Sequence, residues 1–272
     1  MKKVWLITGT ARGLGLEIAR AALHAGDNVV ATARSKAALS DALGDDHDSL
    51  LTLPLDVCDE KTVNESVQQA IEHFGRIDVL VNNAAQAQLG WFETIVPAEV
   101  RRNFDINVIG AMAVTRAVLP VMRRQRAGLL VTISSINGLV ANAGGSVYSA
   151  TKFALEGWME GLAQEVAPLG IGSLIIEPGM MKTDFLDRSS MRQGQLDIPD
   201  YAEAVAQFRA FIDSANHAQP GDPAQLAAKL IELASQENTP ERFVFGADAL
   251  EWAGAKLDRL QQEVDQSAQQ AC

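Results

Sequence analysis

The 272-residue sequence predicts an α/β fold, in which a doubly wound parallel sheet of about seven strands carries helices on both faces. Two observations predict it: short segments rich in Val, Ile and Leu recur along the chain, and amphipathic segments separate them. Apolar segments without polar alternation are typical of parallel strands that are covered on both faces, and strand–helix alternation is typical of doubly wound sheets. The expected strands are residues 4–8, 28–33, 50–55, 77–81, 129–133, 171–176 and 242–245.

Helical periodicity marks the long segments between these strands. The clearest helices are expected at residues 14–25, 61–74, 97–125 and 146–166. No linker, repeat or charge block divides the chain, so residues 1–272 are interpreted as one domain.

One segment, residues 184–220, interrupts the alternation of strands and helices. It is polar, carries only a short helical patch at 201–212, and lies between the sixth strand and the next long helix. An insertion in this place predicts a lid over a substrate pocket. The Gln-rich tail after Glu251 predicts a helix that frays at its end.

The composition restricts the possible partners. Lys and Arg number 23 against 34 Asp and Glu, which gives a net charge of −11. Such an acidic chain is a poor binder of nucleic acid and of anionic membranes, and no apolar stretch of 18 or more residues predicts a membrane span. Cys58 and Cys272 lack disulfide or metal spacing and are expected to be free thiols of a cytoplasmic protein.

The four histidines are scattered along the sequence, whereas a metal site needs clustered ligands. We therefore expect no metal site. His217 falls in the expected lid and is the one histidine that is a candidate for facing a substrate.

A glycine-rich segment follows the first strand and opens the first helix: Thr8-Gly9-Thr10-Ala11-Arg12-Gly13-Leu14-Gly15. Glycines let the backbone approach a pyrophosphate, and a helix N-terminus offers free N–H groups and the positive end of the helix dipole. In this context the segment predicts a Rossmann-type dinucleotide site.

The end of the second strand indicates which dinucleotide binds. A carboxylate there would bind ribose hydroxyls and repel a 2′-phosphate, but the strand ends in Ala33 and Arg34. Arg12 in the glycine segment is placed to reach the same region. Two guanidinium groups and no carboxylate favour NADPH/NADP+ as the cofactor.

Tyr148 and Lys152 are four residues apart in a predicted helix, so they share one face. A nearby ammonium stabilises a phenolate and lowers its pKa, which predicts Tyr148 as a general acid or base. The strand at 129–133 ends in Ser134 and Ser135, either of which places a hydroxyl near a substrate oxygen.

Together these motifs resemble the short-chain dehydrogenase/reductase family over residues 4–246. The family's T-G-x-x-x-G-x-G pattern is matched by Thr8, Gly9, Gly13 and Gly15, and its N-N-A pattern by Asn82, Asn83 and Ala84. Its Y-x-x-x-K pattern is matched by Tyr148 and Lys152, and its P-G-x-x-x-T pattern by Pro178, Gly179 and Thr183. Ala85 departs from the glycine that often follows N-N-A, and Arg12 replaces a commoner small residue.

The resemblance implies roles for individual residues. Ser135, thirteen residues before Tyr148, is preferred over Ser134 as the substrate-orienting serine. Asn107 falls at the family's catalytic asparagine, which holds a water beside the lysine. The cofactor site is implied to include Asp56 and Val57 at the adenine, Leu14 in the glycine loop, Asn83 and Ala84 beside the cofactor, and Pro178, Gly179 and Thr183 at the nicotinamide.

The resemblance implies an NADPH-dependent oxidoreductase, similar to carbonyl reductases, that acts on a small-molecule carbonyl or alcohol. It also implies a homodimer or homotetramer joined through helices at 97–124 and 146–168. Two alternatives stay open: a non-catalytic NADPH-binding sensor or scaffold, and a 3-ketoacyl reductase of acyl carrier protein. The net charge of −11 makes the second less favourable, because an acidic carrier protein needs a basic docking surface.

Overall fold

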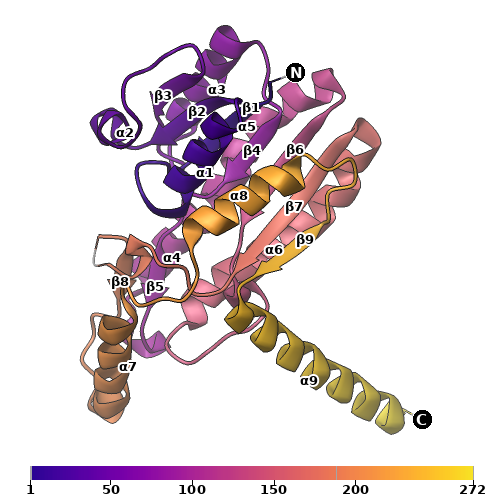
Figure 1. Cartoon of the computed structure of the whole chain (residues 1–272). Coiled ribbons are helices and arrows are strands. Elements are labelled where there is room, and N and C mark those ends of the chain that lie inside the picture. The colour runs from indigo at the N-terminus through magenta and orange to yellow at the C-terminus, as the bar shows by residue number, and fades with distance from the viewer. Residues whose placement is uncertain (1, 188, 272) are drawn as a thin grey trace.

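The computed structural model describes residues 2–187 and 189–271 and contains a seven-stranded sheet in the order β3-β2-β1-β4-β6-β7-β9 (Figure 1). Every neighbouring pair in it is parallel. The strands are β1 (Val4–Thr8), β2 (Asn28–Ala33), β3 (Leu50–Pro54), β4 (Val79–Asn82), β6 (Gly128–Ile133), β7 (Ile171–Pro178) and β9 (Arg242–Phe245). The predicted fold class is confirmed, and the chain reverses its direction across the sheet between β1 and β4, where such folds bind ligands.

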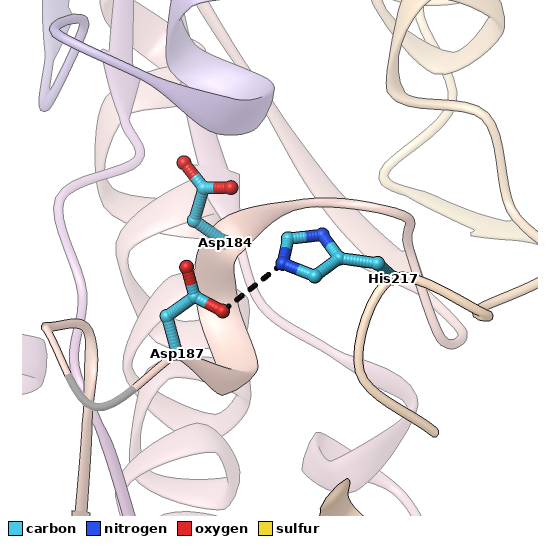
Figure 2. Close-up of side chains that lie close together, drawn as sticks. All are labelled: Asp184, Asp187 and His217. Atoms are coloured by element: carbon cyan, nitrogen blue, oxygen red, sulfur yellow. Dashed lines mark ion pairs between the residues drawn. The ribbon is translucent and has the colours of Figure 1, made fainter. Parts of the chain in front are cut away.

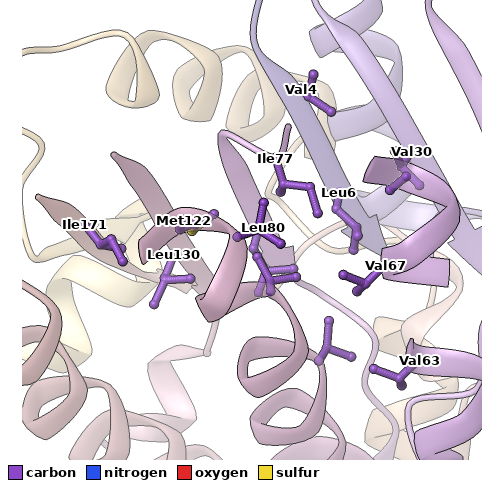
Figure 3. Packing of buried hydrophobic residues seen from close by; sticks show 14 of the residues in the cluster. Val4, Leu6, Val30, Val63, Val67, Ile77, Leu80, Met122, Leu130 and Ile171 are labelled. Atoms are coloured by element: carbon purple, nitrogen blue, oxygen red, sulfur yellow. The ribbon is translucent and has the colours of Figure 1, made fainter. Parts of the chain in front are cut away.

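Successive strand residues are buried on opposite faces of the sheet, because side chains alternate along a strand. Val4 and Leu6 pack into the core on one face (Figure 3), while Trp5 and Ile7 pack into the core on the other. The first core is completed by α3 (Glu60–Phe74), α5 (Gly110–Gln125) and α6 (Ser146–Val166), and the second by α1 (Gly13–His24), α2 (Lys36–Leu43) and α8 (Pro223–Ala234).

The expected strand at 77–81 begins later, at Val79. The Gln125 side chain accepts from the N–H of Ile77 at 3.1 Å and donates to its carbonyl at 2.8 Å. A side chain 48 residues away therefore satisfies the backbone polar groups of Ile77, while the backbone of Asp78 bonds to the neighbouring strands at Val4 and Leu129.

The expected helix at 97–125 is α4 (Pro97–Phe104) and α5, joined by a π-helical turn at Asp105–Ile109. By length and composition alone, Pro97–Gln125 is long and apolar enough to cross a membrane. Its buried residues, among them Val114 and Val118, pack against the sheet, and this packing accounts for the apolar composition.

The segment 184–220 lies over the carboxyl end of the sheet and is tied there by a second, two-stranded sheet of β5 (Ala87–Leu89) and β8 (Met191–Gln193). The helical patch expected at 201–212 is α7 (Ala202–Ala215). β5 and β8 were not expected from the sequence, because three residues are too few for a periodic pattern. Short 3₁₀ turns lie at Phe92–Thr94, Ile136–Gly138, Ala167–Leu169, Asp184–Leu186 and Pro199–Tyr201.

The C-terminal helix α9 (Ala247–Ala271) begins beside β9 and projects away from the body (Figure 1). It begins at Ala247, earlier than the helix expected in the tail after Glu251. Cys58 is a free, exposed thiol as predicted, and Cys272 lies outside the described residues.

Candidate active site

A cavity of about 860 Å³ opens along the carboxyl ends of the strands. The cofactor-site and catalytic residues predicted from the sequence line it, with the exception of Asn107. They are Thr8, Gly9, Arg12, Gly13, Leu14, Gly15, Arg34, Asp56, Val57, Asn83, Ala84, Ser135, Tyr148, Lys152, Pro178, Gly179 and Thr183. Residues from across the chain therefore meet around one space.

The glycine loop needs its glycines for two reasons. Gly9 and Gly13 have φ of 76° and 58°, which side-chain-bearing residues rarely adopt. At Gly15, an added Cβ would lie 2.4 Å from the carbonyl oxygen of Gly9 and 2.4 Å from Nδ2 of Asn83. The loop therefore folds tightly onto the start of α1.

Asn83 holds this loop from the neighbouring strand end. Its Nδ2 donates to the carbonyls of Thr8 at 2.8 Å and Gly9 at 3.1 Å. In return, the Thr8 hydroxyl accepts from the backbone N–H groups of Asn83 and Ala84, both at 3.0 Å. The N-N-A motif thus acts as a brace between β1 and β4.

The N-terminus of α1 is suited to an anion. Arg12 occupies the N-cap position without a capping side-chain hydrogen bond, and the first turn contains no acidic residue. The N–H groups and the positive end of the helix dipole therefore face the cavity, which fits a dinucleotide pyrophosphate. The glycines leave the space that a Cβ would fill.

The two arginines predicted at the cofactor 2′-phosphate differ in their surroundings. Arg34 follows β2 directly, is exposed and lines the cavity. Arg12 instead donates to the Ser189 hydroxyl at 2.9 Å and to its carbonyl at 3.2 Å. Arg12 thus connects the glycine loop to the segment 184–220. This contact was not expected from the sequence.

Tyr148 and Lys152 lie one turn apart on α6, and Ser135 lies at the end of β6. The Lys152 ammonium is 5.6 Å from the centroid of the Tyr148 ring and donates to the carbonyl of Ile133 at 2.8 Å. Ser135 forms a side-chain hydrogen bond with Tyr148, while its Oγ also accepts from the N–H of Asn137 at 3.1 Å. A hydroxyl, a phenol and an amine therefore converge on the cavity wall.

Burial governs the titration of this group. It raises the pKa of Tyr148 above its ordinary value of 10, against the opposing hydrogen bond from Ser135. Burial also lowers the pKa of Lys152 to about 8, against the opposing charge of Glu156. The expected lowering of the Tyr148 pKa is therefore not found, because burial dominates and also favours the uncharged form of Lys152.

Asn107 lies behind the cavity wall, within the π-helical turn. Its Oδ1 accepts from the N–H of Gln86 at 2.9 Å, and its Nδ2 donates to the carbonyl of Gln86 and to the Thr151 hydroxyl, both at 3.0 Å. Gln86 itself lines the cavity. Asn107 thus fixes the backbone of Gln86 beside Thr151, the residue that precedes Lys152. The catalytic role of Asn107 stays a prediction.

Sequence reasoning missed a charge cluster next to Lys152, in which two glutamates, Glu156 and Glu177, are buried. The Arg242 guanidinium lies 2.9 Å from Glu156, 2.8 Å from Glu160 and 2.5 Å from Glu177. The pKa of Glu177 is raised to about 7, mainly by burial and then by the negative charge of Glu156, although Arg242 opposes the shift. A signal was present, because Glu177 interrupts an apolar strand and charged residues are rarely fully buried unless paired.

The segment 184–220 forms an apolar cover over Tyr148. Met191, Ile212 and Phe208 pack with Tyr148 in one cluster, and the Phe185 ring lies 5.6 Å from the Tyr148 ring. These contacts exclude solvent from the phenol on its outer side.

His217 belongs to a small polar cluster in this cover rather than to the cavity lining. Its Nε2 lies 3.2 Å from Oδ1 of Asp187, with Asp184 nearby (Figure 2). The Asn216 side chain donates to the same Asp187 oxygen at 2.6 Å. These bonds tie the two ends of the cover together, and the expectation of no metal site stays a prediction.

The profile of the family described as short chain dehydrogenase matches residues 3–194. The chain is 36% identical over 261 residues to the oxidoreductase BOA17 of Botryotinia fuckeliana. The aligned part covers 96% of this chain and 94% of the relative.

Two solved structures are also similar. A short-chain dehydrogenase from Streptomyces avermitilis is 40% identical, has a TM-score of 0.91 and covers 100% of this chain and 98% of its own. The structure of ElxO with NADP bound is 27% identical, has a TM-score of 0.73 and covers 90% of this chain and 96% of its own.

Proposed function

The chain belongs to the short-chain dehydrogenase family, and from this premise we propose that it is an NADPH-dependent oxidoreductase. It transfers a hydride between the nicotinamide and a carbonyl group or secondary alcohol. Tyr148 is its general acid in reduction and its general base in oxidation. The observation that carries the proposal is the convergence of Ser135, Tyr148 and Lys152 on the cavity that the glycine loop also lines.

The reduced nicotinamide, when bound, supplies the hydride to the carbonyl carbon. The Ser135 hydroxyl orients the carbonyl oxygen, and the Tyr148 hydroxyl donates a proton to that oxygen as negative charge develops on it. The Lys152 ammonium, fixed by the carbonyl of Ile133, stabilises the phenolate that remains. Oxidation of an alcohol reverses both transfers.

The preference for NADPH rests on Arg34. This guanidinium lies at the end of β2, where a carboxylate would select NADH. Arg12 lies at the same rim but is bonded to Ser189, so it contributes to phosphate binding together with the cover. The similarity to ElxO with NADP bound supports a nicotinamide dinucleotide as the cofactor, and the choice between the two dinucleotides rests on Arg34.

The substrate is proposed to be a hydrophobic ketone or secondary alcohol. Leu186, Phe208, Phe211 and Ile212 line the cavity from the cover side, and they offer an apolar surface next to Tyr148. Apolar walls with a few polar groups are typical of small-molecule sites.

The test begins with fluorescence titration of the protein with NADPH and with NADH. Oxidation of the bound reduced nicotinamide is then followed by its absorbance against a panel of ketones, aldehydes and quinones. Tighter binding of NADPH with turnover of a panel member supports the proposal. Binding without turnover across the panel favours a sensor or scaffold, and failure to bind either dinucleotide contradicts the proposal.

A further inference from the structure

The C-terminal helix α9 carries an apolar stripe that its own body does not cover. α9 has 25 residues and is therefore about 37 Å long. Leu257, Leu260 and Val264 expose 64%, 40% and 61% of their surface. Isolated large apolar residues on a surface are common, but an aligned row of them marks an interaction site.

The spacing of this stripe is that of a coiled-coil seam. Leu250, Ala253, Leu257, Leu260 and Val264 follow one another at intervals of 3, 4, 3 and 4 residues. This pattern assigns Leu250, Leu257 and Val264 to heptad position a, and Ala253 and Leu260 to position d. Leu250 is 60% exposed, whereas Ala253 is buried with Ile136 at the edge of the body. The uninterrupted exposed part of the seam therefore begins at Leu257.

We propose that α9 pairs with α9 of a second copy of this chain in an antiparallel, two-fold symmetric coiled coil. This interface is separate from the one that the family resemblance implies at residues 97–124 and 146–168. It also does not depend on the catalytic function proposed above.

The apolar layers fit this arrangement. When Leu257 faces the partner's Leu260, two leucine layers form at the centre by symmetry. Val264 then reaches the edge of the partner body beside Ala253, which packs with Ile136 of its own body. The small side chain of Ala253 lets the helix end approach that edge closely.

The flanking charges select the direction of the helices. Residues at position g decide orientation, and here they are Lys256 and Glu263. In an antiparallel pair each Lys256 faces the partner's Glu263, so two attractive pairs form. A parallel pair would place Lys256 against Gln261 and Glu263 against Ala268, with no such attraction.

Glu263 also lies 3.7 Å from Arg259 within its own helix, but both side chains are about 60% exposed. An exposed pair at this distance is weak and leaves the carboxylate available to a second cation. Five acidic and two basic residues lie in Ala247–Ala271, and this excess disfavours an anionic lipid surface as the occupant.

The test compares the full-length variant L257E/L260E with a matched control, Q262E/Q266E, which adds the same charges to the opposite face of the helix. We expect the seam variant to halve the mass measured by sedimentation equilibrium, with a dissociation constant raised by at least about a hundredfold. The control keeps the wild-type mass, and circular dichroism checks that both variants fold. An unchanged mass in the seam variant, or an equal loss in the control, overturns the proposal.

A charge exchange tests the orientation without touching the apolar layers. K256E places like charges at both flanking pairs and is expected to weaken association by about tenfold, and K256E/E263K is expected to restore it. A failure of the double variant to recover overturns the antiparallel pairing. If L257E/L260E loses binding to phosphatidylserine vesicles while its mass stays unchanged, the occupant is lipid and the proposal is wrong.

Discussion

The Lys152 ammonium lies 5.6 Å from the centroid of the Tyr148 ring, and the carbonyl of Ile133 fixes it there through a hydrogen bond of 2.8 Å. The strand end therefore positions the amine, and the helix positions both side chains. This arrangement places a cation beside the phenol on its inner side, while Phe185 covers it on the outer side.

Replacing Tyr148 by Phe removes the proposed proton donor while keeping the ring. Turnover is expected to fall about a thousandfold, because general acid–base catalysis contributes 10²–10⁴. NADPH affinity is expected to stay within a few-fold. The control is Tyr201→Phe, since Tyr201 is the other tyrosine of the chain, is partly exposed and bonds to Glu93. Near-normal turnover of Tyr148→Phe would contradict the proposed mechanism.

The two directions of the reaction are expected to differ in their pH dependence. Burial keeps the pKa of Tyr148 above its ordinary value, so the phenol carries its proton at neutral pH. Reduction, which needs that proton, is then nearly independent of pH until the Lys152 ammonium loses its proton, which is half complete at about 8. Oxidation needs the phenolate, so its kcat/KM rises with pH. Measured profiles of the same shape in both directions would argue against Tyr148 as the titrating group.

Replacing Arg34 by Glu tests the choice of cofactor. The change removes a charge-assisted hydrogen bond and adds a repulsive carboxylate, so NADPH affinity is expected to fall by about tenfold to a hundredfold. NADH affinity is expected to stay equal or to rise. Arg124→Glu makes the same charge change at an exposed position on α5 and is expected to leave both affinities unaltered. Equal losses for both dinucleotides at Arg34→Glu would show that Arg34 does not discriminate.

The sequence was sufficient to predict the parts of the site that depend on local pattern. Apolar runs placed the seven strands, the glycine segment predicted the tight loop at Gly9, Gly13 and Gly15, and helical spacing put Tyr148 and Lys152 on one face. Each of these features is decided by neighbours in the chain.

Contacts between distant segments were beyond such patterns. Arg12 meets Ser189 across 177 residues, and nothing near Arg12 indicates that partner. The π-helical turn that brings Asn107 to Gln86 lies inside the segment 97–125, which was expected as one continuous helix. The Tyr148 pKa depends on how deeply the fold buries the phenol, which the Y-x-x-x-K spacing does not encode.

The cluster around Arg242 leads to a prediction about stability. Replacing Arg242 by Leu leaves Glu156 and Glu177 buried together without their cation. Breaking a buried pair in this way costs about 3 kcal/mol, at the lower end of its range because Arg242 is 34% exposed. Chemical denaturation of Arg242→Leu measures this loss, with Arg209→Leu on the exposed face of α7 as the control.

The same cluster predicts how stability depends on pH. The pKa of Glu177 rises from 4.5 to about 7 on folding, so the folded protein binds this proton more tightly than the unfolded chain does. The stability that Glu177 contributes is therefore complete below about 4.5 and is lost as the pH rises through 7. Glu177→Gln is neutral at every pH and is expected to flatten this part of the profile. In the double variant, Glu177→Gln is also expected to restore part of the stability that Arg242→Leu loses. The effect is largest above pH 7, because Glu177→Gln removes a buried negative charge that has lost its cation. If Glu177→Gln left the pH profile unchanged, or made Arg242→Leu less stable still, the buried carboxyl of Glu177 would not be the titrating group.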